Sequence, residues 1–287
     1  MARNHRDEAT VALINRDVER AADTYTRAAY GTLAGFENEG EDRDPLGPNA
    51  RWAGYGLSYL LLAGACYRAV GKADRAAARC REGIAIARDL RAAVLSGPLD
   101  RACCGEFVGD FETVGNIDTD GGSSGADDGG NGNGDGNASG NDADGDEDGY
   151  DRAIAAYASS EIDDPMSWAT SPMAEAARRG PQQLARNTPH SFNWDELHGS
   201  DPDSASYLVH RPRFKRSRLP AAVSHVTDVG YVHPPRGSTE HNNATWRCPE
   251  CDRSEVNWIA GETICLDCSV RMEENRATTT RSAAWRR

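Results

Sequence analysis

Lysine is almost absent from this chain, and so are long apolar runs. Only Lys72 and Lys215 are lysines among 32 basic residues, a bias typical of a salt-adapted, GC-rich organism such as a halophilic archaeon. The longest apolar run, LSYLLLAGAC (57–66), is too short to span a bilayer. The first residues, MARNHRDEAT, lack the apolar segment of a secretory signal. We therefore expect a soluble, cytoplasmic protein without a membrane partner.

Large apolar side chains are also scarce, because hydrophobic residues make up 38% of the chain, below the usual globular share. The net charge of −13 is unevenly spread: residues 116–149 hold ten acidic and no basic side chains. Residues 121–149 contain 11 glycines and no aliphatic side chain larger than alanine, so they bury too little to offset their ordering entropy. We predict that 116–149 is a disordered acidic insertion.

A calcium loop is the alternative for this segment, because its last aspartates alternate as EF-hand ligands do. A loop that starts at Asp144 places Gly149 correctly at the sixth position. Ala155 stands where the bidentate glutamate would be needed. The missing ligand favours a solvated linker.

Two stretches, residues 11–30 and 57–90, have helical periodicity. The second is interrupted at Gly71, and small or aromatic side chains share one face on each side of that break. Small residues at such positions let the backbones of two antiparallel helices approach closely. The residues concerned are Leu60, Ala63, Gly64, Tyr67, Ala76, Cys80 and Gly83.

This spacing resembles the tetratricopeptide repeat, a helix–turn–helix unit of roughly 34 residues. Ala21, Tyr25 and Ala28 fit a first unit, and residues 99–115 with 150–160 fit a third. The resemblance implies a mainly α fold, an antiparallel helix-pair solenoid over 1–115 and 150–180. An unrelated alanine-rich helical bundle is the alternative, because the signature Trp and the terminal Pro are missing.

Such repeats are usually scaffolds, and the resemblance implies a concave groove that binds a protein. Its groove-facing positions on the first helices are Arg3, Arg6, Leu61, Ala65 and Arg68. The arginines would suit an acidic partner. The alternative is that these arginines form a solvated face.

Residues 181–245 are rich in proline and contain β-like runs at 206–210 and 222–232. Proline is unfavourable inside helices, and β-branched residues favour strands. We predict an extended connector with short strands.

Four cysteines stand in two pairs near the end of the chain, Cys248-Pro-Glu-Cys251 and Cys265-Leu-Asp-Cys268. Two residues between paired cysteines allow a tight turn that aims both sulfurs at one point, and two such turns make a tetrahedral four-sulfur site. The segment between them predicts a hairpin with its turn at Gly261. The residue after each pair, Asp252 or Ser269 here, is commonly glycine, so the second knuckle is expected to be less regular.

The motif resembles a rubredoxin-like zinc ribbon, and we expect this domain over residues 246–272, with a flexible basic tail at 273–287. Four thiolates suit zinc or iron; zinc is favoured because no redox partner domain is visible. Cysteine fills all four positions, which predicts one structural Zn²⁺ and no catalytic one.

No nucleophile motif, phosphate loop or histidine–carboxylate cluster at ligand spacing is found, so no enzyme is expected. The first functional hypothesis is a protein-binding adaptor or regulatory protein that uses the helical groove, with the ribbon as a second module. The alternative is a nucleic-acid-binding zinc-ribbon protein of transcription or translation that uses the basic segment 210–218. Its phosphate-contacting residues would be Arg211, Arg213, Lys215, Arg216 and Arg218.

Overall fold

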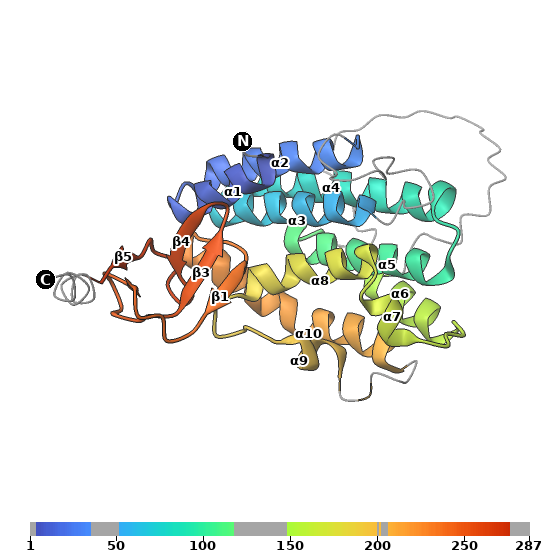
Figure 1. The fold of residues 1–287 in the computed structure, drawn as a ribbon. Coiled ribbons are helices and arrows are strands. Elements are labelled where there is room, and N and C mark those ends of the chain that lie inside the picture. Colours follow the sequence, from blue (N-terminus) through green and yellow to red (C-terminus); the bar gives the residue numbers. More distant parts are fainter. Residues whose placement is uncertain (1–3, 36–51, 118–147, 200, 202–205, 276–287) are drawn as a thin grey trace, which may run out of the picture.

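The computed structural model describes residues 4–35, 52–117, 148–199, 201 and 206–275. Most of the predicted acidic insertion and basic tail, together with Arg3, lie outside these residues. The described chain is a helical bundle with a small antiparallel β region at one end (Figure 1). Its helices are α1 (His5–Ile14), α2 (Val18–Leu33), α3 (Ala53–Ala69), α4 (Ala73–Asp89), the π-helical turn η2 (Leu90–Val94), α5 (Pro98–Gly115), α6 (Gly149–Ala158), α7 (Pro165–Ala169), α8 (Pro172–Ala185), α9 (Trp194–His198) and α10 (Ser206–Val229).

The helices before residue 160 pack as neighbours in chain order, with α1 on α2, α2 on α3, α3 on α4, α4 on α5 and α5 on α6. Gly71 has φ +74° in the turn between α3 and α4, a left-handed conformation that glycine adopts without strain. A Cβ added at Gly64 would lie 2.8 Å from Cys80 Sγ, and one at Gly83 would lie 2.2 Å from Phe111. The small residues picked out by the sequence therefore stand where helices cross closely, while the tetratricopeptide arrangement itself stays a prediction.

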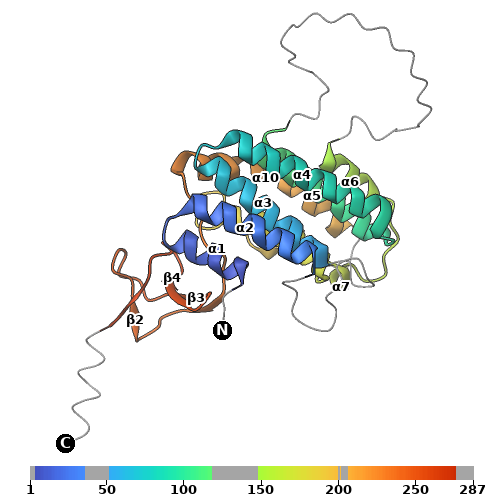
Figure 2. The same cartoon turned by 90° about the horizontal axis from the view of Figure 1, so that it is seen from above.

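The segment expected to be an extended connector is mostly helical, so the prediction of short strands at 206–210 and 222–232 was wrong. Residues 206–229 form α10, which has Pro212 and Pro220 inside it. The helix packs on α3, α5, α6, α8 and α9, and in Figure 2 its orange ribbon is seen behind α5 and α6. Burial of one side, including Leu208, Leu219 and Val226, outweighs the two missing backbone hydrogen bonds.

The β region follows α10. Strands β1 (Ser238–Glu240), β3 (Val256–Ile259) and β4 (Glu262–Cys265) form a three-stranded antiparallel sheet in the order β1-β3-β4. The predicted hairpin is β3–β4, and its two-residue turn, Ala260–Gly261, has positive φ at both positions. A second antiparallel pair is formed by β2 (Trp246–Arg247) and β5 (Glu273–Glu274).

The helical bundle and the β region each have a hydrophobic core of their own. The large one runs through the bundle and is rich in alanine, with Tyr25, Phe107 and Phe111 among its bulky fully buried side chains. The small one consists of Cys248, Val256, Cys265 and Met272, a unit too small to be stable through packing alone. Among the residues that the structure describes, no helix combines the length and the apolarity needed to cross a membrane.

Candidate metal centre and buried ion-pair network

The four cysteines of the two pairs converge on one point. The Sγ atoms of Cys248 and Cys268 are 3.3 Å apart, those of Cys251 and Cys265 3.6 Å, and those of Cys251 and Cys268 3.8 Å. All four sulfurs lie within 4.8 Å of one another. A tetrahedral ion held by thiolates at about 2.3 Å has sulfur–sulfur edges of about 3.8 Å. The cluster therefore fits one four-coordinate metal ion with all positions filled by cysteine.

The two cysteine knuckles repeat the same backbone geometry. The N–H of Asp252 donates to the carbonyl of Cys248 at 3.0 Å, and that of Ser269 to Cys265 at 3.1 Å. Both Asp252 (φ +55°) and Ser269 (φ +63°) have left-handed backbones. The expected irregularity of the second knuckle is therefore wrong, and its serine is held in place by a side-chain contact: His233 Nδ1 lies 2.9 Å from Ser269 Oγ.

Side chains of the bundle hold the second knuckle by its backbone carbonyls. Arg16 Nη2 donates to the carbonyl oxygen of Cys268 at 3.0 Å. Arg186 Nη2 and Asn187 Nδ2 donate to that of Leu266 at 2.7 and 3.0 Å. We call Arg16, Arg186 and Asn187 the carbonyl clamp. The four-cysteine cluster is therefore fixed to the bundle by the turn after α1 and the end of α8.

The clamp also places positive charge beside the thiolates. Four thiolates around a divalent ion leave a net charge of −2, which two guanidinium groups nearby offset. Arg16 has φ +61°, a conformation rare for a residue with a long side chain, and its guanidinium lies 3.6 Å from the centre of the Tyr231 ring. A further contact comes from the β region, where Arg271 Nη1 donates to Asn15 Oδ1 at 2.7 Å.

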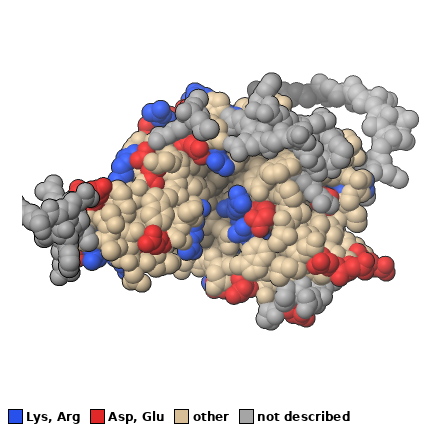
Figure 3. All heavy atoms as spheres, in the orientation of Figure 1, with Lys and Arg blue, Asp and Glu red and all other residues tan. Residues whose placement is uncertain are grey.

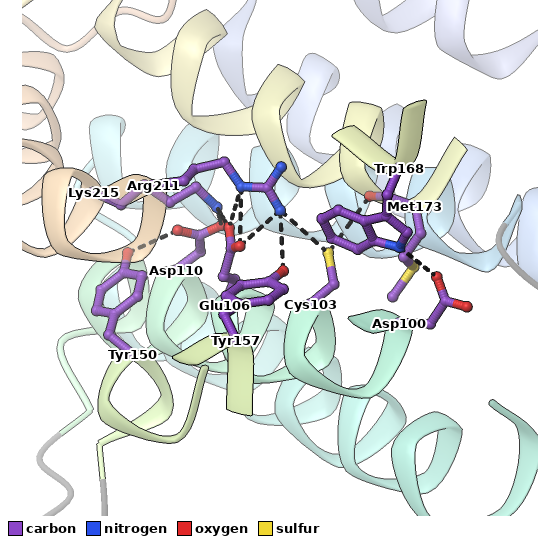
Figure 4. Close-up of polar contacts among 10 residues, drawn as sticks. All are labelled: Asp100, Cys103, Glu106, Asp110, Tyr150, Tyr157, Trp168, Met173, Arg211 and Lys215. Carbon is purple, nitrogen blue, oxygen red and sulfur yellow. Dashed lines mark hydrogen bonds and ion pairs between the residues drawn. The ribbon is translucent and has the colours of Figure 1, made fainter. Parts of the chain in front are cut away.

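A second polar cluster lies inside the bundle, between α5 and α10 (Figure 4). Arg211 donates to Glu106 through Nε at 2.9 Å and through Nη2 at 2.7 Å. Lys215 Nζ lies 3.0 Å from Glu106 Oε2 and 2.8 Å from Asp110 Oδ2. These four side chains have no exposed area, and we call them the buried ion-pair network.

Tyrosines complete the network. Tyr150 donates to Asp110 Oδ1 at 2.7 Å, and Arg211 Nη2 donates to the Tyr157 hydroxyl at 3.2 Å. Burial raises the pKa of Glu106, but Arg211 and Lys215 outweigh it and lower that pKa to about 2. Burial raises the pKa of Asp110 to about 6 against the opposing effect of Lys215. Two cations therefore face two carboxyl groups with most of their hydrogen bonds satisfied within the protein.

The network changes the interpretation of the basic segment. Arg211 and Lys215 are 0% and 1% exposed, so neither offers its charge to a nucleic-acid phosphate. Arg213, Arg216 and Arg218 are exposed on the other side of α10. The pairing had a sequence signal that was missed: Glu106 and Asp110 stand four residues apart in an otherwise apolar stretch, and Arg211 and Lys215 have the same spacing within the basic segment.

The predicted groove is also different from expectation. Leu61 and Ala65 are fully buried. Helices α8 and α10 pack on α3, and Leu61 lies 3.0 Å from where a Cβ on Gly180 would be. Arg68 is partly buried and donates to the carbonyls of Thr113 and Val114 at 3.1 and 2.8 Å. Of the predicted groove residues that are described, only Arg6 is exposed.

Arg6 belongs to a surface that the sequence had not indicated as a unit. Its guanidinium lies close enough to Tyr59 of α3 for the two side chains to influence each other's pKa, and Arg179 of α8 lies 5.3 Å from the centre of the Tyr55 ring. Both tyrosines are half-buried. We call Arg6, Tyr55, Tyr59 and Arg179 the tyrosine–arginine face. Figure 3 shows one face of the molecule, which is hollowed near its middle and has both basic and acidic side chains beside the hollow.

Comparison of the chain with protein-family models, with curated proteins and with solved structures gives no match, so no relative lends a role to any of these residues.

Proposed function

We propose that the four cysteines bind one structural zinc ion and that residues 246–272 are a zinc ribbon. Thiolate sets of this kind select zinc or iron–sulfur chemistry, and a closed four-cysteine site leaves no position for water or substrate. A metal supplies the folding free energy that the small β core lacks, on the order of 10–16 kcal/mol for such sites.

We propose that the protein is a non-enzymatic adaptor that binds another protein over the tyrosine–arginine face. The observation that supports this most directly is that two half-buried tyrosines of α3 lie between arginines from α1 and α8. The Arg6 and Arg179 side chains are 50% and 56% exposed. Tyrosine and arginine are the residue types most enriched at interface hot spots, because they bury a large area and keep a polar tip.

The partner surface that fits is an acidic segment. Arg6 and Arg179 already have Asp7 and Glu175 beside them, at 3.0 and 3.5 Å, and ion pairs this exposed are weak. A partner carboxylate that displaces water here would form bidentate contacts with either guanidinium. The carbonyl clamp keeps the ribbon and the bundle in one orientation, so a partner would meet both as one surface.

The experiment is purification of the tagged full-length protein from its native host at native salt, with and without nuclease. A defined protein that survives nuclease and is lost from the Arg6→Ala/Arg179→Ala variant supports the adaptor. Arg81→Ala/Arg88→Ala is the matched control, since both arginines are exposed on α4 away from this face.

The alternative function is nucleic-acid binding through the arginines of α10 that remain exposed. Arg216 is already held by Asp148 and Asp151, at 3.1 and 2.5 Å, which weakens this case. If the associated material disappears with nuclease, and also with Arg213→Ala/Arg218→Ala, the adaptor proposal fails and the nucleic-acid hypothesis replaces it.

A further inference from the structure

A cavity of about 960 Å³ opens between η2, the first turns of α5 and the end of α6. Arg91, Arg101 and Arg152 line it, and we call it the arginine hollow. Glu161 is the one acidic residue of its lining, so the local formal charge is +2 in a chain whose net charge is −13. A concentration of positive charge in a concave site attracts anions more strongly than the same charge on a flat surface.

The three arginines come from three different elements. Arg91 belongs to the π-helical turn that ends α4, and such turns are frequent at functional sites because they redirect side chains. Arg101 is fixed by a hydrogen bond from Nε to the carbonyl of Leu95 at 2.8 Å. Leu95 in turn closes the π turn through its N–H, 2.8 Å from the carbonyl of Leu90. The guanidinium of Arg101 is therefore preorganised by the backbone beside it.

The floor of the hollow is made of small side chains. Gly105 of α5 packs directly on the α6 backbone, where an added Cβ would lie 3.1 Å from Ala153 N. Ala102, Ala155 and Ala156 complete the floor. Small residues leave the space above them open, and a volume of this size lies within the range of small-molecule sites, about 300–1,000 Å³.

We propose that the arginine hollow binds a small organic molecule that carries two or more phosphate groups and a hydroxyl donor. Guanidinium groups bind phosphate oxygens bidentately, and three of them suit more than one phosphate. Ser159 and Ser160 donate their hydroxyls to the carbonyl of Ala156, at 3.1 and 2.7 Å, which leaves their oxygens as acceptors. Glu161 is a further acceptor. These acceptors would repel a bare polyanion and suit the sugar hydroxyls of a nucleotide.

The test is isothermal titration calorimetry of the full-length, zinc-loaded protein with ADP and, separately, with inorganic pyrophosphate. ADP is expected to bind, and Arg101→Gln to weaken it at least tenfold. Glu161→Gln should weaken ADP without weakening pyrophosphate, because only ADP has hydroxyls for the carboxylate. Arg88→Gln, exposed on α4 and outside the hollow, is the matched control and should bind as the unaltered protein does.

Three results would overturn the proposal: no binding of ADP, equal weakening by Arg88→Gln, or binding of pyrophosphate alone. The second would mean that total charge, not the hollow, attracts the ligand. Circular dichroism of each variant establishes that it is folded, and Arg152→Gln provides a second variant should Arg101→Gln unfold. The hollow and the tyrosine–arginine face share no residue, so either proposal can fail without the other.

Discussion

Single residues in this protein hold positions that their type does not favour, and each does so through a specific contact. Ser269 keeps a left-handed backbone beside Cys268 while its hydroxyl contacts His233. Arg16 does so while it contacts the Cys268 carbonyl and the Tyr231 ring. The sequence showed that Asp252 and Ser269 occupy the usual glycine positions. It could not show which contacts offset the cost of a left-handed backbone, because residues such as His233 lie far from these positions in the sequence.

Lys215→Met is predicted to destabilise the protein strongly. It removes one of two buried cations and leaves Asp110 without its charged partner at 2.8 Å. Breaking one partner of a buried pair costs about 3–5 kcal/mol, much more than a surface change. Urea denaturation measures this, with Arg213→Met on the exposed side of α10 as the control, expected within about 0.5 kcal/mol of the unaltered protein. Equal effects of the two substitutions would contradict the network's role.

His198 is predicted to make the stability depend on pH. Burial and the nearby Arg211 lower its pKa to about 3 from an ordinary value near 6.5. The unfolded chain therefore binds a proton below pH 6.5 that the folded protein excludes, and stability is lost as pH falls from 6.5 towards 3.

The comparison that isolates this effect is His198→Gln, since all other titrating groups are shared. Between pH 6 and 4 the free energy of unfolding should fall more steeply with decreasing pH in the unaltered protein than in His198→Gln. The difference between the two slopes should be up to about 1.4 kcal/mol per pH unit. The exposed His241→Gln variant should keep the steeper slope. Parallel pH profiles for His198→Gln and the unaltered protein would show that His198 is not the group responsible.

At the scale of elements, periodicity located α3 and α4, and strand-forming residues around Gly261 located the β3–β4 hairpin, because these patterns are local. The periodic stretch 11–30 ran across the break between α1 and α2. The prediction failed for α10, where the prolines and the β-branched residues of 206–210 and 222–232 were interpreted as an extended segment with short strands. Its buried side packs on distant segments, and α5 supplies the carboxylates that pair with Arg211 and Lys215. The predicted groove on α3 is covered by α8 and α10. These helices lie far from α3 in the sequence, so local patterns could not predict that they pack there.

Gly83→Ala tests the close crossing of helices. A methyl group there would lie 2.2 Å from the Phe111 ring, so α4 and α5 would have to separate. Overpacking of this kind typically costs about 1–3 kcal/mol. The change is measured by thermal or urea unfolding, beside a surface control such as Arg81→Ala. An unchanged or higher stability of Gly83→Ala would mean that α5 moves aside at no cost.

At the scale of the whole molecule, the carbonyl clamp joins the four-cysteine site to the bundle, so we expect metal binding to affect the bundle's stability. Removing the metal with a chelator is expected to lower the melting temperature of the helical signal, not only to unfold the β region. In Arg16→Ala/Asn187→Ala the clamp loses two of its three donors, so the same chelation should shift the helical transition less. Native mass spectrometry should find one zinc per chain before chelation. If chelation leaves the melting temperature of the helical signal unchanged in both proteins, the metal site and the bundle are not coupled in stability.

The buried ion-pair network also has a consequence for the order in which the chain is made. Glu106 leaves the ribosome 105 residues before Arg211, which neutralises it. Until α10 emerges, the carboxylates of α5 lack the cations that neutralise them, and burial of unpaired charges is costly, so we expect the nascent helices to stay open around them. We therefore expect the bundle to be completed only after most of the polypeptide has been synthesised, and the cysteine knuckles, which follow α10 in the chain, to dock onto it afterwards.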